Sequence, residues 1–267
     1  RGLVDFNAQS DTTQISLREG ESVIAQRSLP SKKYRDAVAG ALGLLQELHF
    51  LNDCREVKAV AHRLIHGGET IREPVIITSK IKDIICQFIP LAPLHIPAGL
   101  HAIEVTEFLF PDAVQTGVFD TGFFAHIPPA AYLYPVPYEW YSEWGIRRFG
   151  YHGTSHAYAM ERAAQMLAHS AEDLHLITCH LGQGSSATAI ANGKAVTNTM
   201  GFTPLEGFMM GTRSGTVDPG IITYVQRHHG LTADQVEEIL HNQSGLLGVS
   251  GVSGDYREVL RAAEAGH

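Results

Sequence analysis

The sequence is poor in cysteine: its 267 residues contain three, at positions 54, 86 and 179. They are widely spaced and form no CxxC pair, which argues against a disulfide framework and against a cysteine zinc site. Long apolar runs are also missing. No stretch approaches the 18 or so apolar residues that a membrane-spanning helix needs, so we expect no contact with a membrane.

Basic residues are in deficit. Lys and Arg total 20 against 28 Asp and Glu, a formal net charge of −8, which argues against a broad nucleic-acid-binding surface. A content of 44% hydrophobic and 18% charged residues excludes a disordered, collagen-like or coiled-coil chain. The length predicts one large or two small domains. Because the chain begins with Arg-Gly-Leu-Val and ends within a predicted helix, we expect both ends to be cut.

Strands and helices are expected to mix along the chain. Apolar alternation and turn signals predict strands at 12–17, 21–28, 57–65, 114–119, 174–181, 185–191 and 194–199. Helical spacing predicts helices at 33–49, 79–89, 98–110, 156–169, 217–229, 232–242 and 255–265, with Thr154 or Ser155 capping the one at 156. This order favours an α/β or α+β class, and the proline-rich span near 125–137 is the best domain boundary.

Two common nucleotide motifs are absent: neither GxxxxGK[ST] nor a GxGxxG after a strand is present. Instead, loops rich in Gly, His and Arg follow predicted strands. In HRLIHGG (62–68), Arg63 can bind a carboxylate or a phosphate through a bidentate pair of hydrogen bonds. His62 and His66 have the i, i+4 spacing of some zinc ligands, but no HExxH glutamate accompanies them, so we do not favour a metal there.

A lone carboxylate, Asp120, follows the strand at 114–119 in the spelling Asp-Thr-Gly. Aspartic proteases share this spelling but need two such carboxylates, which leaves Asp120 to orient a nucleophile or a hydrated metal. The segment YHGTSH (151–156) opens a predicted helix, where exposed N–H groups favour anions. Helix capping with a structural histidine explains this segment equally well.

Two glycine-rich loops complete the candidate site. HLGQGSS (180–186) joins two strands, and its backbone N–H groups can donate hydrogen bonds to phosphate oxygens. A glycine-rich hairpin without a ligand explains the same sequence equally well. The stretch 201–215 holds several glycines and Arg213 with little periodicity, as functional loops do. Two guanidinium groups, from Arg63 and Arg213, suit the transfer of a charged group between oxyanions.

Taken together, HRLIHGG, APLH, FDTGF, RRFGYHGTSH, HLGQGSS, MGFTPLEGFMMGTRSG and SGLLGVSG resemble the acetate kinase family, which includes propionate kinases. They stand in family order over about 57–257, and residues 1–56 resemble the family only weakly. The resemblance implies an α/β, actin/Hsp70/sugar-kinase-like (ribonuclease H-like) fold of two domains. We expect this fold to be incomplete, with residues 1–124 as an N-terminal domain lacking its first strand. Residues 125–267 would be a C-terminal nucleotide-binding domain lacking its final part.

The same resemblance implies reversible transfer of the ATP γ-phosphoryl group to acetate, giving acetyl phosphate and ADP with Mg²⁺, in a cytoplasmic homodimer. Asp120, His152, Arg63 and Arg213 would be catalytic, and His95 and His180 would line the transition state. The acetate pocket would comprise Arg63, Ile65, Leu94, Tyr151 and Pro204. The nucleotide would contact His180, Gly182, Gln183, Gly184, Asp255, Tyr256 and Arg257.

Several departures keep other functions open. The family's phosphate-binding first strand and its metal-anchoring Glu are not in this sequence, so no metal ligand is assigned to the chain. Ile96, Phe124 and Gln183 replace the family's Asn, His and Asn, and Ile65 stands where Val is common. The alternatives are a propionate or butyrate kinase and a non-catalytic, nucleotide-binding remnant of the family.

Overall fold

A computed structural model describes residues 1–6, 11–92 and 95–267. The chain divides into two compact units. The first comprises Arg1–Leu64 and Pro74–Val118, and the second comprises Ile65–Glu73 and Phe119–His267. The domain boundary expected after residue 124 stays a prediction.

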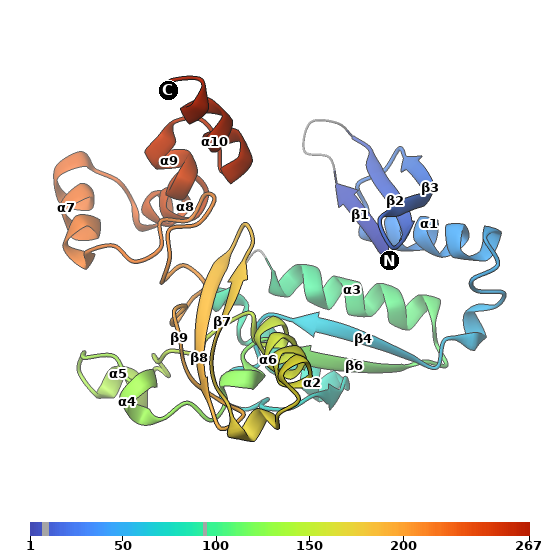
Figure 1. The fold of residues 1–267 in the computed structure, drawn as a ribbon, viewed down its shortest axis with the longest axis horizontal. Coiled ribbons are helices and arrows are strands. Elements are labelled where there is room, and N and C mark those ends of the chain that lie inside the picture. The colour runs from blue at the N-terminus through green and yellow to red at the C-terminus, as the bar shows by residue number, and fades with distance from the viewer. Residues whose placement is uncertain (7–10, 93–94) are drawn as a thin grey trace. The chain divides into compact units, whose positions relative to one another are not determined.

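The first unit opens with an antiparallel sheet in the order β1-β2-β3, formed by Gly2–Phe6, Thr13–Glu19 and Ser22–Leu29. Helix α1 (Tyr34–Glu47) packs against it (Figure 1). Ile15, Leu17 and Leu44 are the buried centre of this contact. A Cβ on Gly40 would lie 2.6 Å from the Leu29 side chain, so the small residue permits close packing of helix and sheet.

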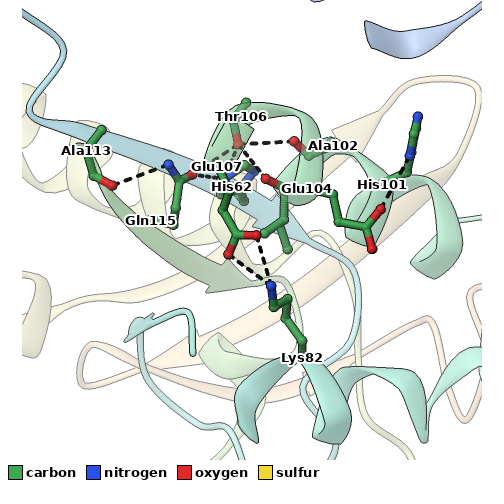
Figure 2. Close-up of polar contacts among 10 residues, drawn as sticks. His62, Lys82, His101, Ala102, Glu104, Thr106, Glu107, Ala113 and Gln115 are labelled. Carbon is green, nitrogen blue, oxygen red and sulfur yellow. Dashed lines mark hydrogen bonds and ion pairs between the residues drawn. The ribbon is translucent and has the colours of Figure 1, made fainter. Parts of the chain in front are cut away.

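A second sheet of this unit has the order β4-β6-β5, from Ala59–Leu64, Val114–Phe119 and Val75–Ile76. Its helices are α2 (Ser79–Cys86) and α3 (Ile96–Leu109), joined by an ion pair of 2.9 Å between Lys82 and Glu107. Figure 2 shows His62 of β4 beside Thr106 and Gln115, with its Nε2 2.8 Å from the Gln115 amide oxygen. This neighbourhood gives His62 amide and hydroxyl partners.

The second unit contains an antiparallel sheet in the order β7-β8-β9, from His175–Leu181, Ser185–Ala191 and Lys194–Asn198. The turn before β9 uses Asn192 and Gly193 at φ 54° and 73°, as predicted from their spelling. Helix α6 (Gly153–Leu167) packs against β7 (Figure 1). Phe124, Ile127 and Ala195 form a buried cluster of this unit.

Six further helices belong to the described part of the second unit. They are α4 (Pro129–Tyr132), α5 (Glu139–Ser142), α7 (Pro219–His229), α8 (Ala233–Asn242), α9 (Gly245–Ser250) and α10 (Tyr256–Glu264). Short 3₁₀ turns occur at Cys54–Glu56, Ile89–Leu91, Gly122–Phe124 and Ala171–Asp173. Across the described ranges, every helix is too short or too polar to cross a membrane.

Candidate functional site

Helix α6 begins at a residue with unusual backbone geometry. His152 precedes the helix with φ 61°, in the left-handed region, and its side chain does not cap the helix. The prediction that Thr154 or Ser155 caps α6 is therefore wrong. Both hydroxyls are recruited by other elements: the Thr154 hydroxyl donates to Asp120, and the Ser155 hydroxyl lies 2.9 Å from Nδ1 of His180.

Asp120 lies directly after β6 and is fully buried. Its Oδ1 accepts the hydrogen bond from Thr154 at 2.8 Å. The start of α6 comes so close that a Cβ on Gly153 would overlap the Asp120 carbonyl oxygen. A glycine is therefore required there, and the HGTSH segment is held against the end of β6.

Two of the predicted histidines are stacked. The rings of His152 and His180 have centroids 4.0 Å apart and an interplanar angle of 25°. His152 Nδ1 lies 2.9 Å from the Ser186 hydroxyl on β8. The end of β7 and the start of α6 thus present two imidazoles side by side.

Sequence reasoning missed His156, which lies one helical turn after His152 and is 1% exposed. Its Nδ1 and Nε2 are each 2.8 Å from a hydroxyl, those of Thr178 and Ser186 respectively. Burial, and after it the neighbouring His180, lower the pKa of His156 to about 4, against an opposing effect of Asp120. The i, i+4 spacing of the two histidines in HGTSH was the signal that could have found it.

The loop between β7 and β8 folds tightly. The Gly182 amide donates to the Gly184 carbonyl at 3.1 Å, and the Ser185 hydroxyl donates to the Gly182 carbonyl at 3.1 Å. A Cβ on Gly184 would lie 3.4 Å both from Nε2 of His152 and from Nη1 of Arg213. His152, Gly184 and Arg213 therefore converge on one place.

Arg213 is half-buried, and burial lowers its pKa. Its Nη1 donates to the Pro204 carbonyl at 3.2 Å. No carboxylate in the described ranges forms an ion pair with it, which leaves a cation in partly desolvated surroundings. Such a guanidinium suits an anionic ligand.

The loop that carries Arg213 is fastened to its neighbours through the backbone. The Leu246 amide donates to the Met210 carbonyl at 2.8 Å, and the Gly211 amide donates to the Gln183 carbonyl at 3.2 Å. Gly245 has φ +64°, and a Cβ there would overlap the Met210 carbonyl oxygen. Helix α9 can thus begin against this loop only with glycine at that position.

A second fastening, also missed from sequence, holds residues 198–206. Arg148 Nη1 donates to the Met200 carbonyl at 2.9 Å and to the Asn198 carbonyl at 3.1 Å, while Nη2 reaches Glu206 Oε1 at 2.6 Å. The Tyr134 hydroxyl donates to the other oxygen of Glu206. We call Tyr134, Arg148 and Glu206 the loop clamp.

The predicted adenosine-binding residues lie at the start of α10. Asp255 caps this helix through the Arg257 amide at 2.8 Å, and its carboxylate also pairs with the Arg257 guanidinium, which lowers the pKa of Asp255 to about 2. Tyr256 is 64% exposed. A Cβ on the preceding Gly254 would lie 3.0 Å from the Gly211 carbonyl, so this segment adjoins the Arg213 loop.

Tyr151, predicted to line the acetate pocket, is 1% exposed and donates its hydroxyl to the Phe202 carbonyl at 2.7 Å. Burial raises its pKa. Its ring lies edge-on to His66, with centroids 5.8 Å apart. Ile65 is partly buried and comes directly before His66, and Pro204 is buried. Because the Phe202 carbonyl engages its hydroxyl, Tyr151 can contribute only its aromatic ring to an apolar pocket.

Three other predicted residues belong to the first unit or fall outside the description. Arg63 is an exposed residue of β4, and His95 is a partly buried residue that precedes α3. Leu94 lies outside the described residues. The second unit alone brings together Asp120, His152, His180, Arg213 and the 182–184 loop. The parts played by Arg63, His95 and Leu94 stay predictions.

Possible metal ligands are sparse. Throughout residues 1–6, 11–92 and 95–267, no three His, Cys, Asp or Glu side chains gather in a way that could hold a metal ion.

Comparison with known proteins gives a consistent result. The chain is 44% identical over 268 residues to an acetate kinase of Cyanothece sp., covering 100% of this chain and 65% of that protein. It is 46% identical over 271 residues to an acetate kinase of Thermoanaerobacter pseudethanolicus, covering 100% of this chain and 67% of that one. The chain therefore spans about two thirds of the length of these relatives, and slightly less than two thirds of the Cyanothece protein.

Solved structures agree. A propionate kinase from Francisella tularensis subsp. tularensis has a TM-score of 0.90 at 36% identity, covering 100% of this chain and 67% of that one. An acetate kinase from Porphyromonas gingivalis has a TM-score of 0.84 at 37% identity, covering 98% of this chain and 72% of that one. These matches confirm the predicted actin/Hsp70/sugar-kinase-like α/β fold.

The model of the Acetokinase family matches residues 1–267. It therefore includes residues 1–56, where we expected only a weak resemblance because the motifs lie elsewhere. Together with identities above 40% over the whole chain, this match shows that the chain belongs to the acetokinase family.

Proposed function

We propose that the protein to which this chain belongs is an acetate kinase, which transfers the γ-phosphoryl group of ATP to acetate, reversibly, and forms acetyl phosphate and ADP. The observation that carries the proposal is the convergence of Arg213, His152 and Gly184. Similarity to relatives named acetate kinase supports it.

Phosphoryl transfer places negative charge on the equatorial oxygens of the migrating group, and catalysis consists largely of positioning and neutralising that charge. Arg213 is half-buried, with no described carboxylate to neutralise it. His152 offers a second donor beside it. Gly182, Gln183 and Gly184 would contact the nucleotide phosphates, with the Gln183 and Gly184 backbone amides as donors, because the Gly182 amide already donates to the Gly184 carbonyl.

Asp120 is the buried carboxylate of this set and would orient acetate or the hydration shell of a magnesium ion. Mg²⁺ commonly binds through one or two carboxylates, water and substrate phosphates. When bound, it would neutralise charge on the phosphates. Asp255, Tyr256 and Arg257 would contact the adenosine, since they adjoin the Arg213 loop through Gly254.

For the acceptor, we propose that Arg63 binds the carboxylate and that His95 and His180 line the site, as the family resemblance implies. Ile65, Leu94, Tyr151 and Pro204 would surround the methyl group. The bulkier Ile65 favours acetate over propionate, although one methylene is worth only about 1–3 kcal/mol. Propionate is the second candidate, because a propionate kinase has a TM-score of 0.90 to this chain. We also propose a cytoplasmic homodimer, as the family resemblance implies.

The test is a hydroxamate assay of acetyl phosphate formed from ATP, Mg²⁺ and acetate, with propionate in a parallel assay. We expect Arg213→Ala to lower turnover roughly 10²–10³-fold, because one preorganised charge contributes a few kcal/mol to transition-state stabilisation. Arg227→Ala, on the exposed surface of α7, is the matched control and should leave turnover unchanged. Equal turnover of the two variants would contradict the role of Arg213. Nucleotide binding by a folded chain without any product would favour the non-catalytic alternative.

A further inference from the structure

A buried line of hydrogen bonds runs behind His152. It links the Thr178 hydroxyl to His156 Nδ1 at 2.8 Å, then His156 Nε2 to the Ser186 hydroxyl at 2.8 Å, then that hydroxyl to His152 Nδ1 at 2.9 Å. Thr178, Ser186 and His156 are 7%, 0% and 1% exposed. Because water has little access to these groups, each depends on the others for its hydrogen bonds.

As long as His156 is neutral, all the hydrogen bonds in this line run the same way: each group accepts a hydrogen bond from one neighbour and donates one to the next. A neutral imidazole carries one N–H and one bare nitrogen, so it donates on one side and accepts on the other. Burial lowers the pKa of His156 to about 4, with His180 adding to the effect and Asp120 opposing it. His156 is therefore neutral near pH 7, and the direction at Thr178 decides the direction at His152.

The hydroxyl proton of Thr178 fixes the direction of these hydrogen bonds, because it needs an acceptor. In the described part of the chain, the Thr178 hydroxyl has His156 as its hydrogen-bond partner and no other acceptor. If His156 donated to Thr178, the buried hydroxyl proton would have no acceptor, which is costly. Thr178 therefore donates to His156 Nδ1. It follows that His156 Nε2–H donates to Ser186, and that Ser186 donates to His152 Nδ1.

We propose that Thr178, His156 and Ser186 are positioning residues that hold His152 with Nδ1 as a hydrogen-bond acceptor and its proton on Nε2. The Nε2 edge of His152 is the one that approaches Gly184, where Arg213 also approaches. An N–H at this edge donates to an oxyanion, whereas a bare nitrogen would repel one. The consequence for phosphoryl transfer rests on the proposed function, but the tautomer does not.

The direct test is nitrogen NMR of the chain labelled with ¹⁵N-histidine, with the His152 signals identified by their loss in His152→Gln. We expect a protonated Nε2 and an unprotonated Nδ1 for His152 at neutral pH. Ser186→Ala and Thr178→Val should both shift the His152 signals toward the other tautomer. Thr178→Ser keeps the hydroxyl and should retain the original signals. A proton on Nδ1 in the unaltered chain would overturn the proposal, as would unchanged signals in both Ser186→Ala and Thr178→Val.

Turnover gives a second readout. Thr178→Val and Ser186→Ala should each lower kcat roughly tenfold to a hundredfold, the range found when a metal-ligating histidine loses its outer hydrogen-bond partner. KM for acetate should stay unchanged, and Thr178→Ser should restore kcat. Unchanged kcat in both variants would overturn the positioning role. If the Nε2 tautomer is observed but the unaltered chain makes no acetyl phosphate, the proposed function fails and the tautomer assignment stands.

Discussion

Gly201, in the Arg213 loop, is required by contact rather than by turn geometry. A Cβ on Gly201 would overlap both the Glu206 carboxylate and the Tyr134 hydroxyl, two members of the loop clamp. Gly201→Ala therefore forces the clamp apart. We expect a loss of about 1–3 kcal/mol in unfolding free energy, the usual cost of overpacking.

Urea denaturation would measure this loss. Gly220→Ala is the control, because Gly220 is an exposed residue in the first turn of α7, where the atoms nearest to a Cβ are the end of the flexible Asp218 side chain, at 3.2 Å or more. That variant should be close to neutral. If Gly201→Ala were as stable as Gly220→Ala, the clamp would not be tightly packed.

At the scale of elements, the loop clamp ties residues 198–206 to the segment before α6. A guanidinium serves several carbonyls and a carboxylate in one plane, which a lysine ammonium cannot do. Arg148→Lys should therefore lower the unfolding free energy by about 2 kcal/mol. It should also lower turnover, because the clamped loop includes Pro204, the hydrogen-bond partner of Arg213.

Thermal melting and the hydroxamate assay would check both effects. Arg162→Lys is the matched control, since Arg162 makes an exposed hydrogen bond to Gln165 within α6. Wild-type stability and turnover in Arg148→Lys would show that the clamp does not position the loop.

Most of the elements could be predicted from the sequence, because their signals are local. The strands at 114–119 and 185–191 have the predicted bounds. Helix α9 (Gly245–Ser250) was missed, since it is short and begins at a glycine with φ +64°. The start of α6 was wrong by about one turn, because Asp120 and His180 bind the hydroxyls that local rules assign to capping. Strand β1 (Gly2–Phe6) was missed as well.

The residues of the candidate site also fall into two groups, those that could be predicted from the sequence and those that could not. Its motif residues could be named from their spelling, but Thr178, Ser186, His156 and the loop clamp could not. Their roles depend on hydrogen bonds between elements distant in sequence, such as the one from Ser186 on β8 to His152. No local pattern reports such a contact.

For the whole molecule, two buried histidines predict how stability depends on pH. Burial lowers the pKa of both His66 and His156 from 6.5 to about 4. Between these values the unfolded chain binds protons that the folded chain does not, so the stability present above pH 6.5 is lost as the pH falls toward 4. Each group should cost about 1.4 kcal/mol per pH unit in this window.

Urea denaturation at several values from pH 7.5 to 4.5 would measure the slope. His156→Gln should reduce it, because glutamine does not titrate. The lowered pKa values of about 2 for Asp53 and Asp255 act below this window. A pH-independent unfolding free energy between 7 and 5 would contradict the prediction.

The left-handed backbone of His152 has an evolutionary consequence. A residue other than glycine or asparagine in that conformation lowers the stability of the fold by about 1–2 kcal/mol. His152→Gly and His152→Ala both remove the imidazole, so comparing them isolates the backbone, and the glycine variant should melt higher. Selection for stability alone would thus drive this position toward glycine. In relatives that have lost the chemistry, we expect glycine or asparagine at this position.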